Sequence, residues 1–142
     1  KEFGRRGFPG LLGPSLGVSL ALCNGIALNP TDVMIGTSIT PIYTRNVAGF
    51  AQTAGFLHEV SGGRFRFGVG VSHAPALNRM GITAGKPLSD MRQFVEDMHA
   101  VPRVGDLPPI VLANLRDKMI QLAQEDGGGM VFANGARPHM GQ

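Results

Sequence analysis

The sequence predicts an α/β fold built from parallel βα units. Helical periodicity and short runs rich in β-branched residues alternate along the chain from residue 15 onward. The strand-like runs are apolar on both faces, which is typical of strands buried in a parallel sheet. This alternation favours strands joined by crossover helices, and both doubly wound sheets and (β/α) barrels satisfy it.

The composition is that of a globular protein of about one domain. The chain has 142 residues, of which 43% are hydrophobic and 16% charged, and this balance is unlike that of a disordered segment. It contains no apolar run near the ~20 residues that cross a membrane, and we expect a cytoplasmic location. The net charge of +3 is not gathered into a basic stripe, so a nucleic-acid partner is not expected.

The first elements are predicted to be an arm and a helix. Residues 1–14 are rich in Gly and basic residues without a clear period, which indicates a loop or arm, and residues 15–142 form the predicted domain. A helix should follow Pro14-Ser15 and end at Asn29-Pro30, because the residue before proline avoids the helical conformation. Its expected inner face, at helical spacing, consists of Val18, Ala21, Leu22, Gly25 and Leu28.

The next predicted unit is a strand and a helix. The run from Val33 to Ile39 predicts a buried strand, which Pro41 should prevent from continuing. A second helix should begin after Asn46, whose side chain is a good N-cap, and end at Gly62-Gly63. Its predicted inner face is Val47, Phe50, Ala51, Ala54 and Leu57.

The remaining elements repeat this order. A strand is predicted from Phe65 to Val71, then a loop over 72–87 and a helix from about Ser89 to Val101. Arg92 and Glu96 have the spacing of an intrahelical ion pair. A strand over 110–113, a helix over 117–125 and a strand over 130–133 complete the alternation.

Three strings of this sequence resemble one known family. The first is IGTSITPIYTRN (Ile35–Asn46), and the second is AQTAGFLHEVSGGRFRFGVGVSH (Ala51–His73). The third is PPIVLANLRDKMIQLAQE (Pro108–Glu125), which runs into GMVFANGARPHM (Gly129–Met140). Together they resemble the luciferase-like monooxygenase superfamily, and most closely its deazaflavin-dependent oxidoreductases. The stretch from Val60 to His73 is the specific part of this signature.

The resemblance implies strands three to six of a TIM-type (β/α)8 barrel, which is therefore partial or reduced here. A closed barrel takes on the order of 200–250 residues, and the family's first two and last two strands are not evident in the sequence. Three alternatives stay open. The chain is a fragment of a larger polypeptide, a half-barrel that pairs with another copy, or a reduced member of the family.

In such barrels function lies at the carboxyl ends of the strands. The resemblance implies a non-prolyl cis peptide bond against the cofactor ring, here Ser38–Ile39; the alternative is an ordinary trans strand end. The other cofactor-binding residues that it implies are Gly70, Val71, Ser72, Ala113, Asn114, Arg116 and Asn134. Catalytic residues are not carried over, because no match for the family's proton-handling residue is found. His73 is the catalytic candidate beside the site, with a structural hydrogen-bonding role as its alternative.

The resemblance implies an oxidoreductase that exchanges hydride between a cofactor and a small organic substrate. The implied cofactor is 8-hydroxy-5-deazaflavin (coenzyme F-420), with FMN as the alternative. A second hypothesis is a non-catalytic half-barrel, in a homo-oligomer such as a homodimer or completed by the remainder of a larger barrel. A dinucleotide-binding Rossmann domain fits poorly, because Gly68 and Gly70 lead into a long loop rather than a helix.

Overall fold

The computed structural model describes residues 10–12, 19–29, 32–102, 105–113, 117–125 and 128–131 of the chain. Its strands form one parallel sheet in the order β1-β2-β4-β5-β6. These strands are Gly10–Leu12 (β1), Ile35–Thr37 (β2), Phe65–Gly70 (β4), Ile110–Ala113 (β5) and Met130–Val131 (β6). The short strand Thr40–Pro41 (β3) pairs with β4 beyond the end of β2.

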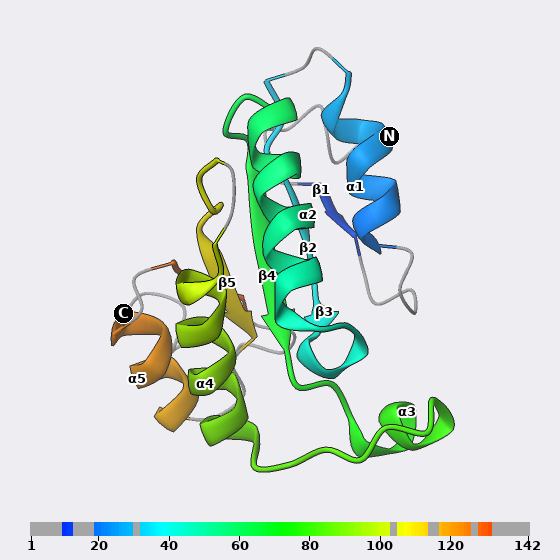
Figure 1. Ribbon diagram of the computed structural model, residues 1–142, viewed down its shortest axis with the longest axis vertical. Coiled ribbons are helices and arrows are strands. Elements are labelled where there is room, and N and C mark those ends of the chain that lie inside the picture. Colours follow the sequence, from blue (N-terminus) through cyan, green and yellow to red (C-terminus); the bar gives the residue numbers. More distant parts are fainter. Residues whose placement is uncertain are drawn as a thin grey trace, which may run out of the picture.

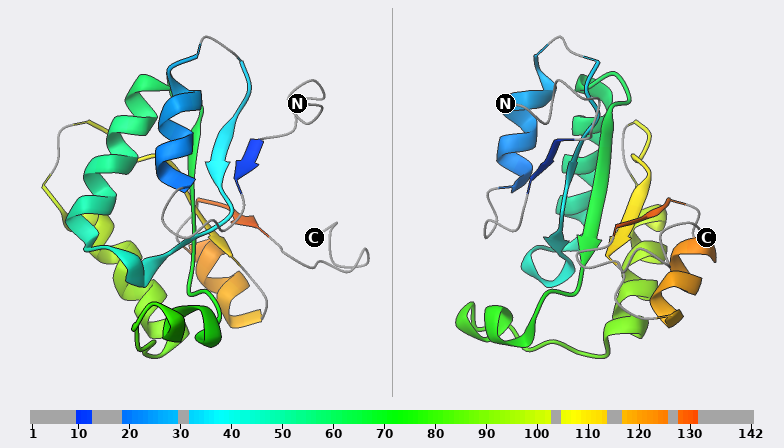
Figure 2. Two further views of the ribbon diagram at one scale, coloured as in Figure 1. Left: turned by 90° about the vertical axis from the view of Figure 1, so that its right-hand side faces the viewer. Right: turned by 180° about the vertical axis from the view of Figure 1, so that it is seen from behind.

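The helices cover one face of this sheet (Figure 1). The four that contribute to its core are Ser19–Ala27 (α1), Val47–Val60 (α2), Pro87–Ala100 (α4) and Asp117–Glu125 (α5). Seen from behind, the strands lie in front of these helices (Figure 2). The opposite face, which we call the open face, carries no helix in the described part of the chain. The predicted parallel α/β architecture is confirmed.

The core lies between the sheet and the helices. Along β4, Phe65, Phe67 and Val69 are fully buried in it. The ring of Phe50, from α2, packs against the rings of Phe67 and Phe94, with 5.7 Å between ring centroids in both pairs. Phe50 thus joins α2 to β4 and α4. Because successive strand residues point to opposite sides, the residues between these core positions line the open face. They are Gly36, Arg66, Gly68, Gly70, Val111 and Ala113.

The turn between α2 and β4 explains the SGG part of the signature sequence. The Ser61 hydroxyl donates to the carbonyl of His58 and accepts the backbone N–H of Phe65. Gly62 and Gly63 have φ of 61° and 81°, a region that glycine enters without steric cost. The predicted end of the helix at these glycines is confirmed, and the serine ties that end to the start of β4.

Arg64 completes the same turn by binding four backbone carbonyls. Its guanidinium donates to Ser61 at 2.7 Å, to Val33 at 3.0 Å, to Ala27 at 3.0 Å and to Asn29 at 3.2 Å. Two of these carbonyls stand at the C-terminal end of α1, where a cation also complements the helix dipole. Arg64 therefore joins α1, α2 and the approach to β2 at the amino end of the sheet.

The predicted pattern of α2 is confirmed in detail. The Asn46 side chain accepts the N–H of Gly49 at 2.7 Å and caps the helix. All but Val47 of the predicted inner face are fully buried, and Val47 packs partly buried against the core. In α4 the side chains of Met91, Phe94, Val95 and Met98 are buried in the same core, and Val101 packs partly buried against it.

The prediction that residues 1–14 form a loop or arm is wrong for Gly10–Leu12. These residues pair in parallel with Ile35–Thr37 and form β1 at the edge of the sheet. A strand of three residues is too short to show a period, and its neighbours are glycines and prolines. The sheet therefore has one more strand before β2 than the sequence indicated.

The predicted inner face of α1 is also wrong. The side chains that enter the core are Leu20, Cys23 and Ala27, whereas Leu22 and Leu28 are 47% and 65% exposed. Because α1 is apolar almost all round, two neighbouring stripes satisfy the helical spacing. Packing against the sheet selects between them, and the sequence alone does not. Among the described residues, no helix combines the length and apolarity needed to cross a membrane.

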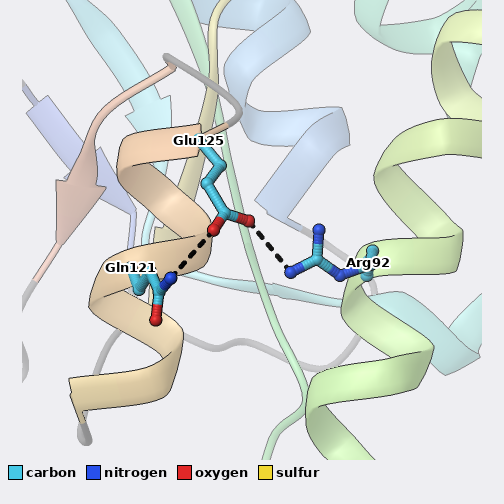
Figure 3. A network of polar contacts seen from close by, with 3 residues as sticks. All are labelled: Arg92, Gln121 and Glu125. Carbon is cyan, nitrogen blue, oxygen red and sulfur yellow. Dashed lines mark hydrogen bonds and ion pairs between the residues drawn. The ribbon is translucent and has the colours of Figure 1, made fainter.

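The strand line ends at Pro41 as predicted, and Pro41 itself pairs with Gly70 as the last residue of β3. Two further expectations change in the structure. The predicted loop over 72–87 contains a short helix, Ala74–Arg79 (α3). Arg92 bonds Glu125 of α5 at 2.9 Å rather than Glu96 of its own helix (Figure 3).

Two threonines beside the gap between β2 and β3 provide a matched pair for measuring buried hydroxyls. Thr37 Oγ1 donates to the Gly68 carbonyl at 2.7 Å, whereas Thr40 Oγ1 is buried without a partner. We expect Thr37→Val to lower the free energy of unfolding by about 1–2 kcal/mol, and Thr40→Val to leave it unchanged or raise it by up to about 1 kcal/mol. Urea denaturation measures the free energy of unfolding of both variants. Equal losses of stability would contradict the difference in hydrogen bonding between Thr37 and Thr40.

Candidate functional site

The strands end at one edge of the sheet, which we call the carboxyl edge. Because all the pairings are parallel, Thr37, Gly70 and Ala113 end β2, β4 and β5 on the same side. In Figure 1 the arrowheads of β3 and β4 point to the end where α3 lies. Ligand sites of parallel βα folds form at such edges.

The peptide bond between Ser38 and Ile39 is cis. This is the bond that the resemblance singled out, and the alternative of a trans strand end is wrong. Ser38 and Ile39 separate β2 from β3 within one strand line, which resumes its pairing with β4 at Thr40. The interruption thus lies at the carboxyl edge.

Gly68 is required by this interruption, and Gly70 leaves room for a neighbouring side chain. A Cβ at Gly68 would collide with the carbonyl oxygen of Thr37, and one at Gly70 would collide with the side chain of Ile39. Both glycines lie within β4, so the Gly68-Val69-Gly70 pattern belongs to a strand and not to a phosphate-binding loop. Their small size lets the segment between β2 and β3 approach β4 closely.

Three of the predicted cofactor-binding residues meet there and form what we call the apolar bed: Ile39, Gly70 and Ala113. The Ile39 side chain lies against Gly70, and the Ala113 Cβ is 3.1 Å from the point that a Gly70 Cβ would occupy. Ile39 and Ala113 are half-buried, so both keep exposed surface. The bed is small and apolar, and part of its surface is exposed.

The residues that follow β4 do not all face the bed. Val71 packs its side chain against the helix-covered core, so it can offer a ligand its backbone. Ser72 has φ of 62°, an uncommon value for a residue other than glycine. His73 is exposed at the start of α3, and its side chain does not cap that helix. The other predicted residues, Asn114, Arg116 and Asn134, lie outside the described residues.

A second polar cluster, absent from the sequence predictions, stands beside the carboxyl edge. The Tyr43 hydroxyl donates to Asp90 Oδ2 at 2.8 Å, and the backbone N–H of Gly85 donates to that hydroxyl. Burial, followed by the bond to Asp90, raises the pKa of Tyr43 to about 12. Tyr43 therefore stays a donor throughout the neutral pH range.

This cluster borders an open groove of about 260 Å³ between the 3-10 turn Ile42–Thr44 (η2) and the helices α2 and α4. The groove is lined by Ile42, Tyr43, Val47, Phe94, Asp90, Gln93 and Asp97. No periodic pattern links Tyr43 to Asp90, which is 47 residues away. The one available signal was that Tyr43 is the only tyrosine of the chain.

A parallel sheet with helices on one face and a small-residue bed at its carboxyl edge defines the class of (β/α)-barrel domains. The chain belongs to the luciferase-like monooxygenase family, whose model matches residues 21–103. The 5,10-methylenetetrahydromethanopterin reductase of Archaeoglobus fulgidus is 31% identical over 133 residues, which cover 80% of this chain. The chain spans 40% of the length of that relative.

Solved structures show the same partial fold. The coenzyme F-420 dependent tetrahydromethanopterin reductase from Methanopyrus kandleri superposes with a TM-score of 0.74 at 16% identity, covering 91% of this chain and 49% of that one. The type II Baeyer-Villiger monooxygenase of Pseudomonas putida, the oxygenating constituent of 3,6-diketocamphane monooxygenase in complex with FMN, gives 0.72 at 16% identity, covering 92% and 50%. The described sheet is therefore about half of a TIM-type barrel.

Proposed function

We propose that the carboxyl edge binds the ring system of 8-hydroxy-5-deazaflavin, coenzyme F-420, in an oxidoreductase that acts on a small organic substrate. The observation that carries this proposal is the apolar bed of Ile39, Gly70 and Ala113 at the carboxyl edge. Membership of the luciferase-like monooxygenase family supports the reaction class. A relative named as a methylenetetrahydromethanopterin reductase, and a solved structure described as coenzyme F-420 dependent, support this cofactor.

The residues present fit the ring part of such a cofactor. A flat aromatic system packs well on small apolar side chains, and a few placed polar groups fix its orientation. Ser38 and Ser72 stand next to the bed along the chain and are the nearest hydroxyl groups in sequence. Asn114, Arg116 and Asn134 stay predictions for contacts to the rest of the cofactor.

When bound, the deazaflavin would supply hydride transfer, and the protein would supply orientation and exclusion of water. The bed sets the plane in which the ring can lie, and the strands beneath it are held by the Phe50 and Phe67 contact of the core. His73 stays the candidate for handling a proton, because it is exposed at the carboxyl edge. The substrate of the whole protein is proposed only as a small organic molecule.

FMN is the alternative cofactor, and one comparison favours it. The structurally similar Pseudomonas putida monooxygenase is described in complex with FMN. Both cofactors carry a planar three-ring system that the apolar bed could support. The charged groups that distinguish their tails would contact residues after Ala113, so the described residues favour neither.

A second candidate function is a non-catalytic half-barrel that binds cofactor or serves as a structural part. It is favoured by the sheet order, in which β1 and β6 are the outer strands among the described residues. Exposed strand edges of this kind pair readily with other strands. We propose that either the remainder of a larger barrel or a second copy of the chain covers them. Native mass spectrometry separates the alternatives, since a stable monomer would contradict pairing of copies.

The experiment that tests the proposed site uses Ala113→Leu, with Val111→Leu as its control. Both positions lie on β5 and face the open side. Ala113 belongs to the bed, whereas Val111 lies two residues earlier in the strand, farther from the carboxyl edge. A leucine at 113 would extend over Gly70, so we expect Kd for coenzyme F-420 or FMN to rise at least about tenfold, a loss of ~1.4 kcal/mol. Val111→Leu should change Kd less than about twofold.

Absorbance and fluorescence titrations of the wild-type chain and both variants measure these affinities. The cofactor that binds more tightly decides between coenzyme F-420 and FMN. Binding of neither to the wild-type chain would overturn the proposal. Equal weakening by the two variants would place the site away from the bed.

A further inference from the structure

The connection between β4 and α4, residues 72–86, lies at the mouth of the proposed site. It leaves β4 just after the apolar bed, turns at Ser72, forms α3 and returns to the first turn of α4. In all three views α3 stands beyond the ends of the strands, on the side of the carboxyl edge (Figures 1 and 2). We call residues 72–86 the strap.

The strap is weakly attached along most of its length. Leu77 is its one buried residue, and it does not belong to the main core. The backbone bonds that shape α3 and the turn after it stay within the strap, from His73 to Ile82. Segments with few buried apolar contacts and exposed backbone bonds open at low free-energy cost.

The return end of the strap is fastened by Tyr43. The backbone N–H of Gly85 donates to the Tyr43 hydroxyl, which in turn donates to Asp90 Oδ2 at 2.8 Å. Gly85 also packs directly on the Asp90 carboxylate, where a Cβ would collide. Tyr43 lies on η2, immediately after β3 and two residues beyond Pro41. The same hydroxyl thus joins the strap, α4 and the segment that follows the bed.

Among the described residues, the Gly85 N–H is the link of the strap to Tyr43, and the bond from Tyr43 to Asp90 holds that hydroxyl in place against α4. Removing the hydroxyl would release this link while leaving the packing of α2 and β4 in place. A fastening of this kind, beside an open bed, suits a cover that must move to admit a ligand.

We propose that the strap is a movable cover of the carboxyl edge and that Tyr43 and Asp90 are positioning residues that hold it closed. The part that concerns the covered ligand rests on the proposed function. The fastening of the strap by Tyr43 does not depend on the proposed function, and it is tested without any cofactor. If the strap closes over the carboxyl edge, a ring bound on the bed would be shielded from water.

The test is limited trypsin digestion, followed at the bond between Arg79 and Met80, which are both exposed. Wild type is compared with Tyr43→Phe, which keeps the ring and removes the hydroxyl. Asp90→Asn keeps an acceptor oxygen and is the conservative variant. Arg92→Met is the matched control, because it removes one polar bond of α4, to Glu125, away from the strap.

We expect Tyr43→Phe to speed cleavage at Arg79 about tenfold, the factor for one such hydrogen bond. Asp90→Asn and Arg92→Met should stay within about twofold of wild type. Hydrogen exchange of Tyr43→Phe should rise over residues 73–86 and not in α2 or β4. An unchanged cleavage rate, or exchange that rises equally throughout the domain, would overturn the fastening.

The covering role is tested by adding coenzyme F-420 or FMN, whichever binds in the titrations, to the wild-type chain. Slower cleavage at Arg79 on binding supports a cover. Binding without any change in that rate would overturn it. If neither cofactor binds, the proposed function fails and the covering role falls with it, whereas the Tyr43→Phe comparison still decides the fastening.

Discussion

Gly68→Ala is expected to lower the free energy of unfolding by roughly 3 kcal/mol or more, a large part of the stability of a domain this size. The added Cβ would collide with the Thr37 carbonyl oxygen and lie 2.9 Å from its carbon. Neither atom can move away easily, because β2 and β4 are paired and the Thr37 hydroxyl bonds the Gly68 carbonyl. Relief would require the two strands to separate.

Gly25→Ala is the control for this variant. Gly25 lies in α1, and a Cβ there would meet no atom within 4 Å. Because alanine favours the helix, we expect a gain of about 0.5–1 kcal/mol. Urea denaturation followed by far-ultraviolet circular dichroism measures both variants. A loss below about 1 kcal/mol for Gly68→Ala would contradict the close approach of Thr37 to β4.

Arg64→Met is expected to cost about 3 kcal/mol, because one guanidinium serves four carbonyls at the amino end of the sheet. Methionine keeps the apolar stem and leaves these acceptors without their donor. Arg64→Lys should cost less, since the ammonium retains the charge but cannot reach all four oxygens. Hydrogen exchange should show α1 loosening first, because two of the carbonyls end that helix.

Arg92→Met separates this effect from the loss of any arginine. Its bond to Glu125 links α4 with α5 through side chains that are 49% and 42% exposed (Figure 3). Exposed pairs of this kind contribute about 0–1 kcal/mol. Equal losses for Arg64→Met and Arg92→Met in thermal denaturation would contradict the assigned role of Arg64.

Elements with a local cause could be predicted from the sequence. The cap at Asn46, the inner stripe of α2 and the strand Ile110–Ala113 depend on neighbours within a few residues, and the structure confirms each. The cis bond at Ser38–Ile39 was also found, but through resemblance to a family, because no local pattern marks it.

The features that were missed depend on packing between distant segments. The strand Gly10–Leu12 forms because β2 offers it an edge, and Leu20 faces the core because the sheet selects one of two apolar stripes. The bond of Tyr43 to Asp90 spans 47 residues. None of these three features can be predicted from the spacing of residues along the chain.

The glycines of β4, Gly68 and Gly70, were correctly predicted to lie in a strand, but no sequence pattern explained why two glycines stand there. In the structure their missing side chains make room for the Thr37 carbonyl and the Ile39 side chain of the neighbouring strand line. The apolar bed follows from this close approach, so the link from sequence to the candidate site is packing and not phosphate binding.

The most direct test of the proposed site is the amide spectrum of the ¹⁵N-labelled chain during titration with coenzyme F-420, and then with FMN. We expect the largest shifts to fall on Ile39, Gly70 and Ala113, with Arg64 at the amino end of the sheet unchanged. Shifts centred on the groove around Phe94, or at the amino end of the sheet, would contradict it. So would a spectrum that neither cofactor changes.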